Sequence, residues 1–263
     1  MFKELLGATL AALQICTAGM TSVPVSDRSP DSPDHTYIVH AAGVYEGFRK
    51  TNSLEALENA YSNGNRYIEL DFNFTSDLRP VCIHDWNHLA YSGFDGVKPT
   101  EDEFMQNGVY SMFSSINLEV LADFLTKHND AYIITDVKDL NVYFAGVISR
   151  EYPHLKDRFI MQVYSENEYA HIRKLGFENI IFSLYKLDWE TKTDVEYLTA
   201  FARSNTLYGY TFPVELCDID GYVEGMLKTD IPLFVHTVNN KTEQKKYFDM
   251  GITGIYTDNV IHT

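Results

Sequence analysis

The sequence has few cysteines and few basic residues, and both shortages exclude functional classes. Its three cysteines, Cys16, Cys82 and Cys217, show no metal-binding spacing and imply no disulfide framework. Lys and Arg number 21 against 37 Asp and Glu, so the formal net charge is −16. This balance argues against nucleic acid as a partner and against simple electrostatic docking on an anionic membrane. An anionic substrate would therefore need local positive charge from a metal or from a placed Lys or Arg.

The N-terminal apolar run is too short and too interrupted for a stable transmembrane helix. Residues 1–20 begin with one Lys, continue with an apolar stretch broken by Gln14, and end in small residues. This pattern resembles a signal peptide or a short signal anchor, and an amphipathic helix packed on the domain is the alternative. Residues 21–36 are rich in Ser, Pro and Asp and predict a linker. We expect a domain boundary at 36/37 and a secreted or membrane-tethered protein, with a cytoplasmic one as the alternative.

Short apolar, β-rich runs alternate with helix-like segments from Tyr37 onward. This alternation is typical of a (β/α)₈ TIM barrel over residues 37–263, and a doubly wound open sheet is the alternative. The predicted strands are Tyr37–Ala41, Tyr67–Asn73, Tyr132–Asp136, Phe159–Val163, Ile180–Leu184, Leu207–Thr211, Leu233–Thr237 and Gly254–Thr257. The predicted helices are Ser53–Asn63, Leu118–His128, Val142–Glu151, Asn167–Leu175, Thr193–Arg203, Gly221–Lys228 and Thr242–Met250. The chain ends six residues after the last predicted strand, so we expect the eighth helix to be missing.

The longest irregular stretch, Asn87–Asn117, is too long for a passive connection and is expected to shape the substrate site. Its apolar residues suit either peripheral contact with a bilayer surface or packing as a lid. These residues are Phe94, Phe104, Met105, Tyr110, Met112 and Phe113.

Two carboxylates lie two residues apart in the predicted strand Tyr67–Asn73. Residues two apart in a strand point the same way, so Glu69 and Asp71 share one face. Two buried like charges repel, and a hard divalent cation such as Mg²⁺ or Ca²⁺ would relieve that repulsion. For this pair alone, solvated acids on a half-exposed strand are the simpler interpretation. The chain then turns back and brings His84 near the same pair.

Polar residues recur at the C-terminal ends of the predicted strands, where barrel active sites lie. Three acids, Glu69, Asp71 and Asp136, suit one divalent ion, and Lys138 can reach an anionic oxygen or form a salt bridge to Asp136. A pair of histidines, with an ordinary pKa of about 6.5, suits general acid and base catalysis. This set of groups favours a phosphodiester substrate, small or lipid-borne. The histidines are His40 and His84, and the candidate substrate contacts are Gln162, Tyr164, Tyr210 and His236.

The chain resembles the glycerophosphodiester phosphodiesterase family, within the phosphatidylinositol-phospholipase-C-like barrels. The resemblance implies a metal-dependent phosphodiesterase with catalytic His40 and His84 and a phosphate-contacting Lys138. It implies Glu69, Asp71 and Asp136 as metal ligands, and in many members a substrate hydroxyl attacks phosphorus to form a cyclic phosphate. The matching motifs follow the family's order and are His40 in VHAAG, Asn52–Ala56, Glu69–Asp71, Thr75–Asp77, His84–Asp85, Asp136–Lys138, His236–Asn239 and Gly254–Asp258.

Three positions depart from the family pattern. Ala41 replaces the usual Arg, Thr51 replaces the usual acid, and Asp136 stands where Glu is common, as in sphingomyelinase-D-like relatives. Arg49 and Lys50 are candidate substitutes for the missing Arg. Two alternatives to hydrolysis therefore stay open, a phospholipase-D-like lyase that releases a cyclic phosphate and a non-catalytic phosphodiester-binding module. A barrel whose acids bind no metal and act only as charge partners is a further alternative.

Overall fold

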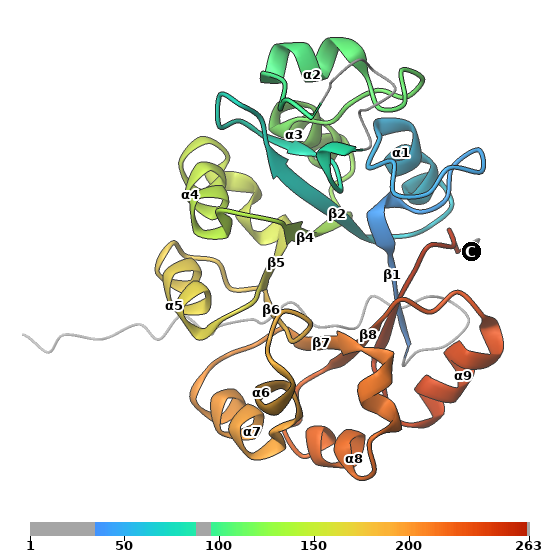
Figure 1. The fold of residues 1–263 in the computed structure, drawn as a ribbon, viewed down its shortest axis with the longest axis vertical. Helices are drawn as coiled ribbons and strands as arrows, with labels where there is room; N and C mark the ends of the chain where they lie inside the picture. The colour runs from blue at the N-terminus through green and yellow to red at the C-terminus, as the bar shows by residue number, and fades with distance from the viewer. Residues whose placement is uncertain (1–34, 88–95, 262–263) are drawn as a thin grey trace, which may run out of the picture.

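The computed structural model describes residues 35–87 and 96–261, which form a closed barrel of eight parallel strands surrounded by helices (Figure 1). The first strand, β1, pairs with both β2 and β9, so the sheet has no free edge in the barrel. The predicted TIM-barrel fold is confirmed, and the strand bounds agree with the predicted ones within two residues. The strands are β1 (Thr36–Val39), β2 (Tyr67–Phe74), β4 (Tyr132–Val137), β5 (Phe159–Val163), β6 (Ile180–Ser183), β7 (Gly209–Pro213), β8 (Leu233–His236) and β9 (Gly254–Thr257).

The helices lie outside the ring of strands (Figure 1). Residues 258–261 follow β9 and form no helix. None of the described helices is both long and apolar enough to cross a bilayer. The helices are α1 (Leu54–Ser62), α2 (Glu101–Asn107), α3 (Leu118–Lys127), α4 (Asn141–Glu151), α5 (Glu166–Lys174), α6 (Trp189–Thr193), α7 (Val195–Ser204), α8 (Tyr222–Leu227) and α9 (Lys241–Asp249).

Strand alternation separates two apolar layers. Ile68, Leu70 and Phe72 of β2 point outward and are fully buried against the helices. Inward-facing residues close the barrel below the site, and Phe234 fills so much of this space that a Cβ at Gly209 or Gly254 would collide with its ring. This inner layer consists of Ile38, Tyr67, Ile134, Ile160, Ile181, Phe234 and Tyr256.

The stretch after β2 is more regular than the sequence analysis predicted. A short antiparallel strand, β3 (Pro80–Cys82), returns along β2, and α2 begins at a capping box formed by Thr100 and Glu103. Phe104 and Phe113 are buried in a cluster with Val81 and Ile83, so these two residues pack within the protein. Met112 is 62% exposed, and Phe94 lies outside the described residues. Residues 1–34, which contain the predicted signal-like segment, also lie outside the described residues.

Candidate active site

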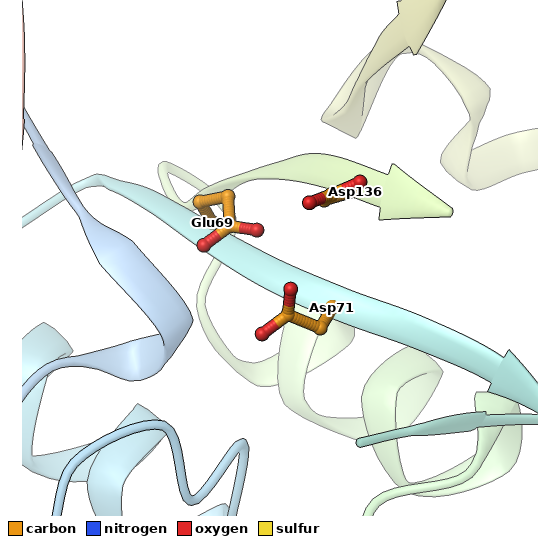
Figure 2. A group of neighbouring side chains, drawn as sticks. All are labelled: Glu69, Asp71 and Asp136. Atoms are coloured by element: carbon orange, nitrogen blue, oxygen red, sulfur yellow. The ribbon is translucent and has the colours of Figure 1, made fainter. Parts of the chain in front are cut away.

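Three carboxylates from two neighbouring strands converge inside the C-terminal mouth of the barrel (Figure 2). Glu69 and Asp71 project inward from β2, and Asp136 projects inward from β4, where it is the register partner of Asp71. One oxygen from each lies within 4.8 Å of the others. Glu69 and Asp71 are almost fully buried, at 2% and 0% exposure. Three acids held this closely in the protein interior need positive charge beside them.

Lys138 supplies part of that charge. Its Nζ donates to Asp71 Oδ1 at 2.5 Å and to Asp136 Oδ2 at 2.6 Å. Burial opposes ionisation of Asp136, but Lys138 outweighs this effect and lowers the pKa of the Asp136 carboxyl. When all three carboxylates are ionised, they and the Lys138 ammonium together carry −2, which one divalent cation would balance. The donor set, all carboxylate oxygens, therefore fits a hard cation such as Mg²⁺ or Ca²⁺.

Glu69 is the carboxylate with the least compensation. Burial first, and then the nearby Asp71, raise its pKa from 4.5 to about 8. Its Oε2 accepts the backbone N–H of Ala41 at 2.6 Å, which orients the side chain. Ala41 adopts a left-handed conformation with φ of 49°, so the turn after β1 aims its amide into the barrel. The residue that lacks the family's arginine side chain thus contributes through its backbone.

His40 is held by a carboxylate on the last strand of the barrel. Its Nδ1 lies 2.8 Å from Asp258 Oδ1, and its Nε2 lies 4.0 Å from Glu69 Oε2. Burial lowers the pKa of His40. The hydrogen bond to Asp258 and the charges of Glu69 and Asp71 raise it by a larger amount, to about 9. Asn239 holds Asp258 in turn, because its Nδ2 donates to Asp258 Oδ2 at 2.8 Å. The Asp258 carboxylate and the nearby acids thus favour the protonated form of His40.

His84 is held in a similar way by its sequence neighbour. Its Nδ1 lies 2.7 Å from Asp85 Oδ2, and its Nε2 lies 3.3 Å from Lys50 Nζ. A carboxylate acceptor beside Nδ1 favours the tautomer with the proton on Nδ1 and a lone pair on Nε2. Of the two candidate substitutes for the missing arginine, Lys50 is thus the one beside His84. Arg49 instead pairs with Asp258 at 3.5 Å with a side chain that is 68% exposed.

A cavity of about 270 Å³ joins these groups. His40, His84, Asp136 and Lys138 line it, as do Glu69 and the predicted contacts Gln162 and His236. Burial first, and then the charge of His40, lower the pKa of His236 to about 4, so His236 is neutral at physiological pH. The cavity is also lined by Tyr185, Thr237 and Tyr256, which are not among the predicted substrate contacts. Tyr256 of β9 lies two residues before Asp258, so alternation along the strand turns both side chains inward. This alternation is the feature of the sequence from which Tyr256 could have been predicted.

Two predicted substrate contacts do not line the cavity. The prediction for Tyr210 is wrong. Alternation along β7 turns Thr211 inward and Tyr210 outward, where the Tyr210 hydroxyl donates to Leu198 O at 2.8 Å. Tyr210 is fully buried in the layer between strands and helices and is not available to substrate. Tyr164 lies one layer behind the cavity and donates its hydroxyl to Asp136 Oδ1. Its contact is therefore with a candidate metal ligand.

Asn52 links the loop after β1 to the acidic centre. Its Nδ2 donates to Asp71 Oδ2, and its Oδ1 accepts the Asp71 backbone N–H, both at 2.9 Å. Asn52 is fully buried and left-handed, with φ of 49°, a conformation that asparagine tolerates better than most residues. The Asn52–Ser53 pair was visible in the sequence as a motif, but its contact with Asp71 required the fold.

Fold and site together define a (β/α)₈-barrel protein with an acidic centre between two carboxylate-held histidines. The Glycerophosphoryl diester phosphodiesterase family matches residues 44–262, so the chain belongs to this family and is a phosphoric diester hydrolase by class. A glycerophosphodiester phosphodiesterase of Bacillus altitudinis is 23% identical over 229 residues, which cover 81% of this chain and 91% of that protein.

Solved structures of similar proteins have the same fold. The glycerophosphodiester phosphodiesterase of Thermotoga maritima superposes with a TM-score of 0.67 at 21% identity, over 87% of this chain and 95% of that one. One from Parabacteroides distasonis gives 0.68 at 19% identity, over 86% and 93%. A phosphodiesterase of Oleispira antarctica, in complex with the product sn-glycerol-3-phosphate, gives 0.64 at 15% identity, over 86% and 94%.

Proposed function

We propose that this protein hydrolyses a glycerophosphodiester or a phospholipid headgroup with one divalent metal ion and a pair of histidines. The observation that carries the proposal is the meeting of three carboxylates, two of them buried, with two carboxylate-held histidines beside one cavity. Family membership supports a phosphodiester as the substrate class. The sn-glycerol-3-phosphate bound to the Oleispira antarctica relative supports a glycerol-containing one.

In this proposal Glu69, Asp71 and Asp136 hold the cation, Mg²⁺ or Ca²⁺. When bound, it supplies positive charge that stabilises the negative charge developing on the phosphoryl oxygens. Lys138 balances the charges of Asp71 and Asp136 through its two ion pairs. Its role as a direct phosphate contact stays a prediction.

The two histidines divide the proton transfers. His84, which lines the cavity, accepts the proton of the attacking hydroxyl or water through Nε2, the ring nitrogen that does not face Asp85. His40 carries a proton that Asp258 and the neighbouring acids stabilise, and it gives this proton to the leaving oxygen. One P–O bond forms and one breaks, and both protons pass through groups that the barrel holds in place.

The size of the cavity favours a small substrate group. About 270 Å³ lies just below the roughly 300 to 1,000 Å³ usual for ligand pockets. A phosphodiester with a short polar alcohol suits this space, and an acyl chain would extend outside it. Gln162 and His236 lie where they can hydrogen-bond such an alcohol.

Turnover of a panel of glycerophosphodiesters and lysophospholipids, with EDTA and then with added Mg²⁺ or Ca²⁺, tests the proposal. We expect activity that EDTA stops and a divalent ion restores, and that His84→Ala or Asp71→Asn abolishes without loss of the fold. His154→Ala, which changes a histidine far from the cavity, serves as the matched control. Full activity in either site variant would contradict the mechanism, and binding without turnover would favour a binding module. Phosphorus NMR of the product separates hydrolysis from cyclic-phosphate release.

A further inference from the structure

Two positive charges at the acidic centre are already engaged by carboxylates. Lys138 contacts both Asp71 and Asp136, and His40 contacts Asp258. Arg49 lies on the outer side of the same Asp258 with a largely exposed side chain. An anionic phosphodiester that enters the cavity therefore needs a cation that these acids do not neutralise.

Lys50 has the position and the charge for this role. Its Nζ lies 3.3 Å from His84 Nε2, the nitrogen of a residue that lines the cavity. A neutral imidazole nitrogen accepts a hydrogen bond from an ammonium but does not balance its charge. Within residues 35–87 and 96–261, no carboxylate lies within ion-pair distance of the Lys50 ammonium. Lys50 thus presents net positive charge beside one of the two candidate catalytic histidines.

The backbone holds Lys50 in this place. Its φ is 55°, a left-handed conformation that is uncommon for a long side chain and recurs at functional sites. Two residues later, the side-chain amide of Asn52 binds Asp71 through both Nδ2 and Oδ1, and Asn52 Nδ2 also donates to Lys50 O at 3.4 Å. The loop that carries Lys50 is therefore tied to the strand that carries the acidic centre.

We propose that Lys50 binds a non-bridging phosphate oxygen of the substrate, beside His84 Nε2. The proposal rests on the proposed phosphodiesterase function and adds the residue that recognises the anionic group. A phosphate oxygen between Lys50 Nζ and the cavity would accept a charge-assisted hydrogen bond, which is stronger than a neutral one. It would also lie next to the nitrogen that takes the proton from the nucleophile.

Two lysine variants and one control test this role in the full-length protein with Mg²⁺. Lys50→Gln removes the charge at similar length, Lys50→Arg keeps it, and Lys127→Gln removes a charge from an exposed position at the far end of α3. We expect Lys50→Gln to lower kcat/KM by about 10- to 100-fold and Lys50→Arg to recover most of this loss. Lys127→Gln should match the wild type, and the thermal midpoints of all variants should agree with it.

Inorganic phosphate provides a readout that does not need turnover. We expect Lys50→Gln to weaken phosphate binding, measured by calorimetry, by the same factor as it lowers kcat/KM. Unchanged phosphate binding in Lys50→Gln would overturn the proposal, and so would absence of phosphate binding to the wild type. If the wild type binds phosphate through Lys50 but turns over no phosphodiester, the proposed function fails while this inference stands. A loss of kcat alone, with phosphate binding intact, would mean that Lys50 only positions His84.

Discussion

His40 Nδ1 and Asp258 Oδ1 lie 2.8 Å apart across the seam where the first and last strands of the barrel pair. The two residues are 218 positions apart in the sequence. They meet because Val39 and Thr257, the residues before them, are register partners between β1 and β9. Closure of the barrel is thus what gives one candidate catalytic histidine its carboxylate.

Replacing Asp258 by Asn should weaken catalysis through His40. The carboxylate raises the pKa of His40, so its loss should lower that pKa and move the alkaline limb of the kcat/KM profile to lower pH. We expect kcat to fall by about 10- to 100-fold, the usual effect of losing a group that orients a site residue. Asp249→Asn, which removes an exposed acid of α9, is the control. An unmoved alkaline limb would argue against His40 as the proton donor.

The metal-free protein should lose stability as pH rises from about 6.5 to 9. His40 has a folded pKa of about 9 against 6.5 unfolded, so the folded state binds more protons over this window. Its contribution is fully present below pH 6.5 and is lost as pH rises through 9. The raised pKa of Glu69 acts in the same direction from pH 4.5 to about 8. We expect a decrease on the order of 1 to 3 kcal/mol in the free energy of unfolding, measured by urea titration in EDTA.

Saturating Mg²⁺ should reduce that pH dependence. A cation bound to the three carboxylates favours ionised Glu69 and opposes protonated His40, so both pKa values should fall. Glu69→Gln should flatten part of the metal-free curve without any added ion. An identical pH dependence with and without Mg²⁺ would show that the ion does not bind beside these groups.

Asn52→Ala should destabilise the fold and the site together. It removes two buried hydrogen bonds to Asp71 and places alanine at a left-handed position, for an expected loss of about 2 to 4 kcal/mol. Asn52→Gly removes the same hydrogen bonds without the left-handed penalty, so it should be less destabilised. Asn107→Ala, at an exposed position on α2, is the control. Equal unfolding midpoints for the Ala and Gly variants would contradict the strain assignment.

Two Tyr→Phe variants should separate a cavity residue from a core residue. Tyr210→Phe loses one hydrogen bond to Leu198 O and should cost about 1 kcal/mol of stability with unchanged kinetics. Tyr185 lines the cavity with its hydroxyl 3.5 Å from Asp136 Oδ1, so Tyr185→Phe should change KM with little effect on stability. Steady-state kinetics and thermal unfolding of both variants check the pair, and a kinetic effect in Tyr210→Phe would contradict its outward orientation.

Local patterns in the sequence were sufficient for the barrel and its acidic face. Alternating β-rich runs and helical segments predicted the eight strands, and the two-residue spacing of Glu69 and Asp71 predicted their shared face. Periodicity depends on residues that are close together in the sequence, so it can be recognised without knowledge of the fold. Tyr210 was wrongly predicted as a substrate contact, because the sequence did not establish which of Tyr210 and Thr211 points inward; the observed strand bounds and pairing established this parity.

Three of the partnerships at the site were decided by tertiary structure alone. The contacts of His40 with Asp258, Asn52 with Asp71, and Lys50 with His84 join segments that only barrel closure brings together. The sequence by itself therefore determined the fold class and the types of chemical group at the mouth. Which charges neutralise one another there depends on distances through space, and these follow from strand register and backbone conformation after folding.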